Sequence, residues 1–204
     1  MQSEGVGLTF REVSGLRPFV AAEVAGLPVS LMVHSNASFA AMVTHDVARR
    51  AGLRLAPVER PDYGIVRVGS LGGRGRTTAT TRLRVGEDVA AVEIAVFDVP
   101  QDEPVDGMLG VGWLRERGAV VDLGEGRLRF ASASPAGCAL AWDEDWSAYV
   151  VEARVAGQPA RFVVSTVAGL VVDARAVERL GLTAGPVVET DGGPTGTVVE
   201  VRSL

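Results

Sequence analysis

The sequence repeats one pattern at long range, and this repeat limits the fold more than any other feature. Ala25–Pro28 (AGLP) returns as Ala156–Pro159 (AGQP), 131 positions later. With the same shift, His34-Ser35-Asn36 corresponds to Ser165-Thr166-Val167. A repeat of this length indicates two related structural units. The second copy has no counterpart of the Asp106–Gly110 segment, so we expect one complete unit and about half of another.

Each copy opens with the residues of a β-hairpin followed by a helix. Valine-rich segments broken by glycine and proline predict two short strands within residues 19–33. Val43, Val47 and Ala51 recur at the period of a helix, for which Thr44 is the expected N-cap and Gly52 the expected end. Further strands are expected near residues 80–85, 92–99 and 105–109, with hairpin tips at residues 72–75 and 124–126.

Composition excludes several classes of function. The net charge of −5 leaves no basic surface for nucleic acid, and no apolar run approaches the length that spans a membrane. The single cysteine, Cys138, rules out an intrachain disulfide, and the start of the chain does not read as a signal peptide, so we expect a cytoplasmic protein. The two histidines and the cysteine are scattered, so no metal and no cofactor are expected. Arginine without lysine suggests bacterial coding.

Two motifs together carry a resemblance to a known family. They are the strand-turn-helix segment of residues 19–53 and Asp106–Gly110 (DGMLG), which is followed by Trp113-Leu114. The chain resembles the retropepsin-like and pepsin-like aspartic proteases. This resemblance implies an all-β fold with short helices, an acid-protease-like β-barrel architecture, and two related lobes of which the second is abbreviated. The expected divisions are an N-terminal strand segment (1–17), a complete lobe (18–131), a linker (132–148) and a partial second lobe (149–204).

The chain departs from the family where the family carries its chemistry. Each lobe of an aspartic protease supplies an aspartate at the start of an Asp-Thr-Gly or Asp-Ser-Gly turn, and the two carboxyl groups share a proton. Here the resemblance places His34 and Ser165 at those positions. Loss of one positioned acid–base group typically costs about 10²–10⁴ in rate. With both replaced, we expect a pseudoprotease without aspartic protease activity.

The candidate site consists of the two turns and a hairpin expected to cover them. His34 is the one candidate catalytic residue, as a general base. The alternative is a structural role, in which His34 fills a decayed active-site turn and forms hydrogen bonds with the backbone. Ser165 and Thr166 are expected to keep the hydrogen bonds that tie the turns together in the family. Asn36 is expected to adopt left-handed backbone angles, which Val167 disfavours. The candidate binding residues are Ser35, Asn36, Ser165, Thr166, Val167 and, on the hairpin called the flap in the family, Gly72, Gly73 and Arg74.

Two functions follow as hypotheses. The first is binding of an extended peptide or a small apolar molecule in the cleft between the lobes, with an apolar lining from Val33, Phe39, Met42 and Leu170. The alternative is a repurposed enzyme of small-molecule metabolism, in which His34 promotes a cyclisation, isomerisation or proton transfer. The open sheet edges of a partial lobe could be completed by residues 1–17 or by a second chain, as in a homodimer.

Overall fold

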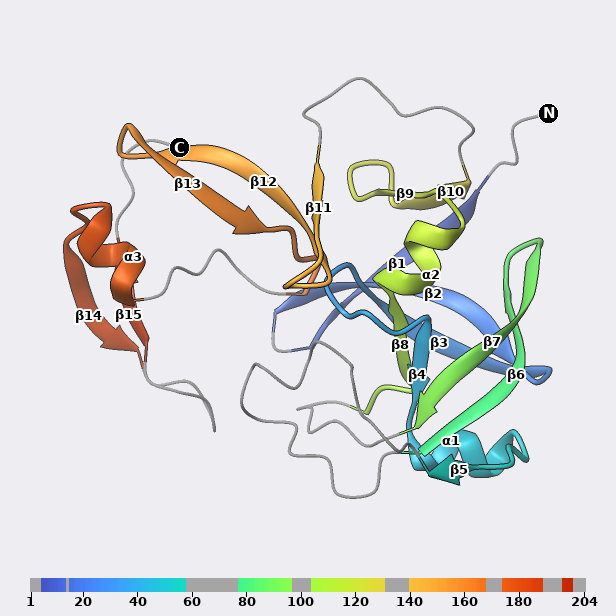
Figure 1. Ribbon diagram of the computed structural model, residues 1–204. Coiled ribbons are helices and arrows are strands. Elements are labelled where there is room, and N and C mark those ends of the chain that lie inside the picture. The colour runs from blue at the N-terminus through green and yellow to red at the C-terminus, as the bar shows by residue number, and fades with distance from the viewer. Residues whose placement is uncertain are drawn as a thin grey trace.

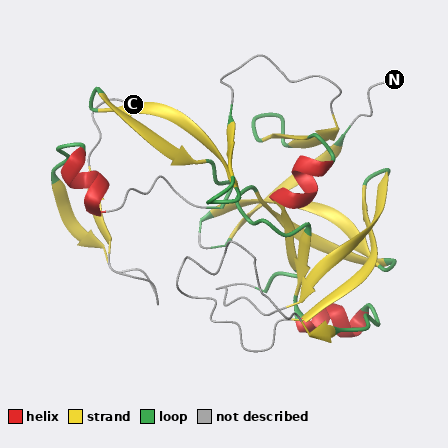
Figure 2. Cartoon of the chain, viewed as in Figure 1, coloured by secondary structure: helices red, strands yellow, loops and turns green. Residues whose placement is uncertain are grey.

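A computed structural model describes residues 5–13, 15–57, 77–96, 104–130, 140–167, 174–188 and 196–199 of the chain. Most of these residues lie in strands, and the helices are short, so the expected all-β class with short helices is confirmed (Figures 1 and 2). The expected flap residues Gly72, Gly73 and Arg74, and Leu170 of the expected cleft lining, fall outside the described residues.

The first unit is a barrel built from one large sheet. Its strands lie in the order β5-β6-β7-β4-β8-β3-β2-β1-β10-β9, and an additional pairing of β6 with β2 closes it. Two short helices accompany the strands, α1 (His45–Arg50) and α2 (Val111–Glu116). The strands are β1 (Val6–Glu12), β2 (Leu16–Val24), β3 (Leu27–His34), β4 (Ala41–Val43), β5 (Ala56–Pro57), β6 (Thr77–Val85), β7 (Asp88–Val96), β8 (Gly107–Gly110), β9 (Ala119–Asp122) and β10 (Arg127–Phe130).

The second unit is smaller and lies beside the barrel (Figure 1). A three-stranded sheet has the order β11-β12-β13, and a separate two-stranded sheet pairs β14 with β15. Its main cluster of buried residues consists of Val155, Ala160 and Leu180, a far smaller core than that of the barrel. Its elements are β11 (Ala141–Asp143), β12 (Ala148–Val155), β13 (Gln158–Val163), α3 (Ala174–Arg179), β14 (Ala184–Val188) and β15 (Gly196–Val199).

The repeat seen in the sequence is also present in the backbone. The β2–β3 turn has Ala25 and Gly26 at φ 51° and 85°, and the β12–β13 turn has Ala156 and Gly157 at φ 50° and 78°. These left-handed angles suit a two-residue hairpin turn, because they match the twist of the flanking strands. The helices end alike as well, since Gly52 after α1 and Gly181 after α3 have φ 64° and 62°. Equivalent residues therefore perform equivalent local tasks in the two units.

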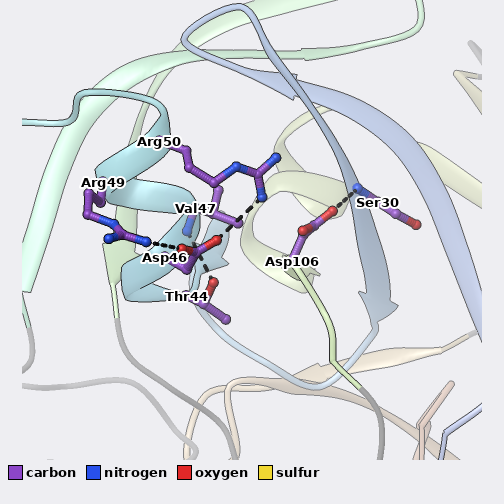
Figure 3. Close-up of polar contacts among 7 residues, drawn as sticks. All are labelled: Ser30, Thr44, Asp46, Val47, Arg49, Arg50 and Asp106. Carbon is purple, nitrogen blue, oxygen red and sulfur yellow. Dashed lines mark hydrogen bonds and ion pairs between the residues drawn. The ribbon is translucent and has the colours of Figure 1, made fainter.

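The start of α1 follows from local hydrogen bonding. The hydroxyl of Thr44 accepts the backbone N–H of Val47 at 3.3 Å, which confirms the expected N-cap (Figure 3). The carboxylate of Asp46 accepts hydrogen bonds from Arg49 and Arg50 on the exposed side of the helix. The helix is thereby fixed at the end of β4, with its buried residues against the barrel core.

Strand β8 lies between β3, with which it is parallel, and β4, with which it is antiparallel. The space between these two strands leaves no room for a side chain at either end of β8. A Cβ atom at Gly107 would lie 2.1 Å from the carbonyl oxygen of Met42, and one at Gly110 would lie 2.0 Å from that of Phe39. Just before the strand, the carboxylate of Asp106 accepts the backbone N–H of Ser30 on β3 at 2.9 Å (Figure 3). The DGMLG motif is therefore explained by close packing behind the end of β3.

Two expectations for the chain outside the barrel strands are changed by the structure. The suggestion that residues 1–17 complete the second lobe is wrong, because β1 pairs with β2 and β10 of the barrel. Part of the expected linker is a strand, since β11 pairs with β12. Trp142 helps to hold this segment as a strand, because its ring contacts Tyr149 edge-on and its centroid lies 4.2 Å from the guanidinium carbon of Arg115 on α2. Trp146, the other aromatic of this segment, is exposed.

Replacing Gly110 with alanine tests the packing of β8. The new methyl group would meet backbone atoms, which cannot rotate away, so we expect Gly110→Ala to lower the free energy of unfolding by about 1–3 kcal/mol or more. Urea unfolding monitored by tryptophan fluorescence measures the change. Gly7→Ala is the matched control, because a Cβ there has no neighbour within 4 Å. Equal effects of the two substitutions would contradict this account.

Candidate binding site at the paired turns

The two turns that follow β3 and β13 lie against each other and are joined by their backbones and hydroxyl groups. The N–H of Ser35 donates to Oγ1 of Thr166 at 3.1 Å, and the N–H of Thr166 donates to Oγ of Ser35 at 3.0 Å. The Ser35 hydroxyl in turn donates to the carbonyl of Val164 at 2.9 Å, and the Thr166 hydroxyl donates to that of Val33 at 2.5 Å.

These four hydrogen bonds, which we call the turn network, obey the symmetry of the repeat. The shift of 131 positions that relates Ser35 to Thr166 also relates Val33 to Val164, so each bond has its symmetric counterpart. Each hydroxyl both accepts an amide proton and donates to a carbonyl, so its hydrogen-bonding capacity is used on the opposite turn. The tie between turns that was expected from Thr166 is present, and Ser35 is its second half.

The third residues of the turns complete the contact. The hydroxyl of Ser165 donates to Oδ1 of Asn36 at 3.2 Å and accepts the N–H of Val167 at 3.2 Å. The expectation of left-handed backbone angles at Asn36 is wrong, because positive φ among the described non-glycine residues is confined to Ala25, Ser147 and Ala156. Val167 avoids these angles too, as expected for a β-branched residue. Asn36 contributes its side-chain amide to the site.

His34 is electrically neutral in this setting. Burial of the imidazole lowers its pKa from 6.5 to about 4, because the charged form loses hydration. The interaction with the Asn36 side chain raises the pKa, whereas the positive charge of Arg17 lowers it. The Nδ1 atom of His34 is buried and has no hydrogen-bond partner within the part of the chain that the structure describes. His34 therefore presents a neutral ring at physiological pH.

Arg17 is the residue of this site that the sequence analysis missed. The sequence could have indicated Arg17 through the register of the β2–β3 hairpin. This register pairs Phe19 with Met32, and two residues further from the turn it sets Arg17 opposite His34. The hairpin turn at Ala25–Gly26 alone fixes this register.

The expected apolar lining is wrong for three of its four residues. Val33, Phe39 and Met42 are at most 4% exposed and belong to the buried core of the barrel. Phe39 and Met42 form a cluster with residues such as Phe19 and Met108, against which Val167 packs from the second turn. The apolar character of these side chains serves the interior and not a cleft. These three residues therefore offer little apolar surface to a ligand at the turns.

The chemistry available at the paired turns is hydrogen bonding. The imidazole of His34 and the amide of Asn36 can donate to or accept from a ligand, whereas the hydroxyl of Ser165 already donates its one proton to Asn36 and accepts the N–H of Val167. Neither turn contains a carboxyl group. In the described ranges, no three histidine, cysteine or carboxylate side chains gather where they could hold a metal ion. None of the helices in those ranges is long and apolar enough to cross a membrane.

A double-mutant cycle on Ser35→Ala and Thr166→Val tests the turn network. Each substitution removes bonds that the other residue also needs, so their effects on the free energy of unfolding should be non-additive by about 0.5–3 kcal/mol. Urea unfolding of the wild type, both single variants and the double variant measures the coupling. Thr9→Val on the exposed face of β1 is the control and should combine additively with Ser35→Ala. Additivity in the first pair would show that the network does not couple the turns.

The lowered pKa of His34 predicts an acid-dependent loss of stability. Between pH 6.5 and about 4 the unfolded chain binds a proton that the folded chain does not, so stability falls as the pH falls through this window. The full loss amounts to roughly 3 kcal/mol at 1.36 kcal/mol per pKa unit. His34→Gln should remove this part of the pH dependence, whereas His45→Gln at the exposed start of α1 should retain it. NMR titration of the ring protons gives the pKa directly, and a value near 6.5 for His34 would contradict the assignment.

Comparison with known proteins finds similar solved structures but no matching family. No protein-family model matches the sequence, and no curated protein matches it significantly. Among solved structures, the chain is similar to the retroviral protease-like domain of Ddi1 from Leishmania major, with 19% identity over 57% of this chain and 90% of that one and a TM-score of 0.42. It is also similar to a retropepsin-like aspartic protease from Rickettsia conorii, with 16% identity over 63% and 94% and a TM-score of 0.40.

Proposed function

We propose that this chain is a non-proteolytic, acid-protease-like protein that binds an extended peptide at the paired turns. The observation that supports this most is the turn network, which holds the two turns together although His34 and Ser165 stand where the family resemblance expects carboxylates. An intact frame without an acid–base pair is suited to holding a ligand and not to hydrolysing it.

The character of the site favours a peptide over a small apolar molecule. Val33, Phe39 and Met42 are buried in the core and offer little apolar surface to a ligand. The side chains of His34, Asn36 and Ser165 instead provide polar groups, which match the N–H and C=O groups of an extended backbone. This chemistry recognises a peptide by its main chain.

A repurposed enzyme is the second candidate, and one observation favours it. The Nδ1 atom of His34 has no hydrogen-bond partner among the described residues, so it could accept a proton from a bound metabolite. A pKa of about 4 argues against this role, because a general base works best when its pKa lies near the operating pH. Binding is therefore the better supported function.

The test combines a binding assay with a cleavage assay on the same peptides. Fluorescence anisotropy with a library of blocked, extended peptides should identify binders, and mass spectrometry from pH 3 to pH 7 should find them uncleaved. His34→Ala should weaken affinity by no more than about fivefold, since one neutral hydrogen bond contributes about 1 kcal/mol. Acid-dependent cleavage would refute the proposal, and turnover of a metabolite that His34→Ala abolishes would favour the enzyme. The double substitution His34→Asp and Ser165→Asp asks whether the aspartates alone were lost.

A further inference from the structure

Strand β13 is the last strand of the three-stranded sheet β11-β12-β13, and no other strand of the described residues pairs with its far edge. Every second residue of β13, counted from Gln158 beside the hairpin turn, directs its N–H and C=O groups toward β12. Arg161 and Val163 are not in this series, so their N–H groups point away from β12. No hydrogen bond of the described residues uses these two N–H groups. An edge of this kind can pair with another extended chain.

The first unit shows what such an edge accepts. Ser30 and Met32 on β3 correspond by the repeat to Arg161 and Val163 on β13. The outer edge of β3 is covered by β8, which runs parallel to it with Met32 opposite Met108. Ahead of β8, the carboxylate of Asp106 accepts the N–H of Ser30 at 2.9 Å. The occupant of the equivalent edge in the barrel is thus an acidic residue followed by a short strand of glycine and apolar residues.

The surroundings of β13 carry excess positive charge. A groove of about 550 Å³ is lined by Arg154 on β12, Arg161 on β13 and Arg179 on α3, with Glu152 as its one acidic residue. Arg161 already forms an ion pair with Asp143, so Arg154 and Arg179 supply most of the uncompensated charge. A segment that brings a carboxylate to this groove would be attracted electrostatically.

We propose that the free edge of β13 binds an extended segment of another protein that runs parallel to the strand and begins with an acidic residue followed by glycine-flanked apolar residues. Main-chain hydrogen bonds to Arg161 and Val163 supply affinity, and the acidic residue selects the register by meeting the N–H of Arg161 beside the arginine-lined groove. This surface is separate from the paired turns, because it uses the backbone of β13 and not the side chains of His34, Asn36 and Ser165.

The test uses the full chain and a labelled peptide with the sequence of residues 106–112, Asp-Gly-Met-Leu-Gly-Val-Gly. Fluorescence anisotropy should detect binding, and Val163→Pro should weaken it roughly three- to tenfold, because the substitution removes one main-chain donor. Proline is suited to such an outward position, as Pro159 already occupies one on β13. Val163→Thr is the matched control, since it keeps the N–H group and should bind within about twofold.

Charge and backbone can be tested without disturbing the fold. Arg179→Gln should weaken binding about two- to fivefold at low salt, whereas Arg49→Gln on α1 should not. A peptide methylated on alternate backbone nitrogens should fail to bind the wild-type protein. Because main-chain recognition at the paired turns would be lost too, the response to Arg179→Gln assigns the binding to the edge even if Val163→Pro does not fold.

Three outcomes would overturn the proposal. The first is no binding of the parent peptide. The second is binding that Val163→Pro and Arg179→Gln both leave unchanged, which would place the peptide elsewhere than at the β13 edge. The third is self-association of the protein that competes with the peptide, which would make a second copy of this chain the occupant of the edge. Failure of the edge leaves binding at the paired turns intact as a separate question.

Discussion

The contact between Ser35 and Thr166 is the interaction on which the arrangement of the two units depends. Each of its four hydrogen bonds contributes modestly, typically about 0.5–1.5 kcal/mol. Their effect is larger as a set, because removing one hydroxyl leaves an amide and a carbonyl of the opposite turn without partners. Among the described residues, the units are also joined by the hydrogen bond from Ser165 to Asn36, by Arg115 against the ring of Trp142, and by the packing of Val167.

The two turns are not supported equally. The first follows β3, which is held from behind by β8 and its glycines within the large core of the barrel. The second follows β13, an edge strand on a sheet whose core is built around Val155, Ala160 and Leu180. The first turn is therefore a fixed template, and the second takes its position largely through hydrogen bonds to the first.

Electrostatics at the turns changes what the site can do. Two carboxyl groups that share a proton would supply both an acid and a base, whereas a buried neutral imidazole and a hydroxyl do not form such a pair. Burial keeps His34 neutral, and the nearby charge of Arg17 opposes its protonation further. The hydroxyl of Ser165 is engaged with Asn36 and Val167 and so has no base positioned to activate it as a nucleophile. These features support the proposed binding function over the proposed enzymatic one.

The sequence by itself determined the features that depend on short stretches of backbone. The hairpin turn at Ala25–Gly26, the Thr44 cap and the helix end at Gly52 each rest on local backbone angles or a local hydrogen bond. The glycines of Asp106–Gly110 stand out in the sequence, but the reason for them lies in contacts with the distant backbone of Met42 and Phe39. The repeat added the correspondence between the turns.

Only the tertiary structure decided which side of each element faces the core. Phe39 and Met42 are apolar by residue type, but their burial depends on side chains of distant strands that pack against them. The partners of β1 were also decided by the tertiary structure, which pairs this strand with β2 and β10 and not with the second unit. The segment around Trp142 is a strand on which Tyr149 and Arg115 pack. Such contacts join residues far apart in the chain, and their free energy is set by packing that no local pattern encodes.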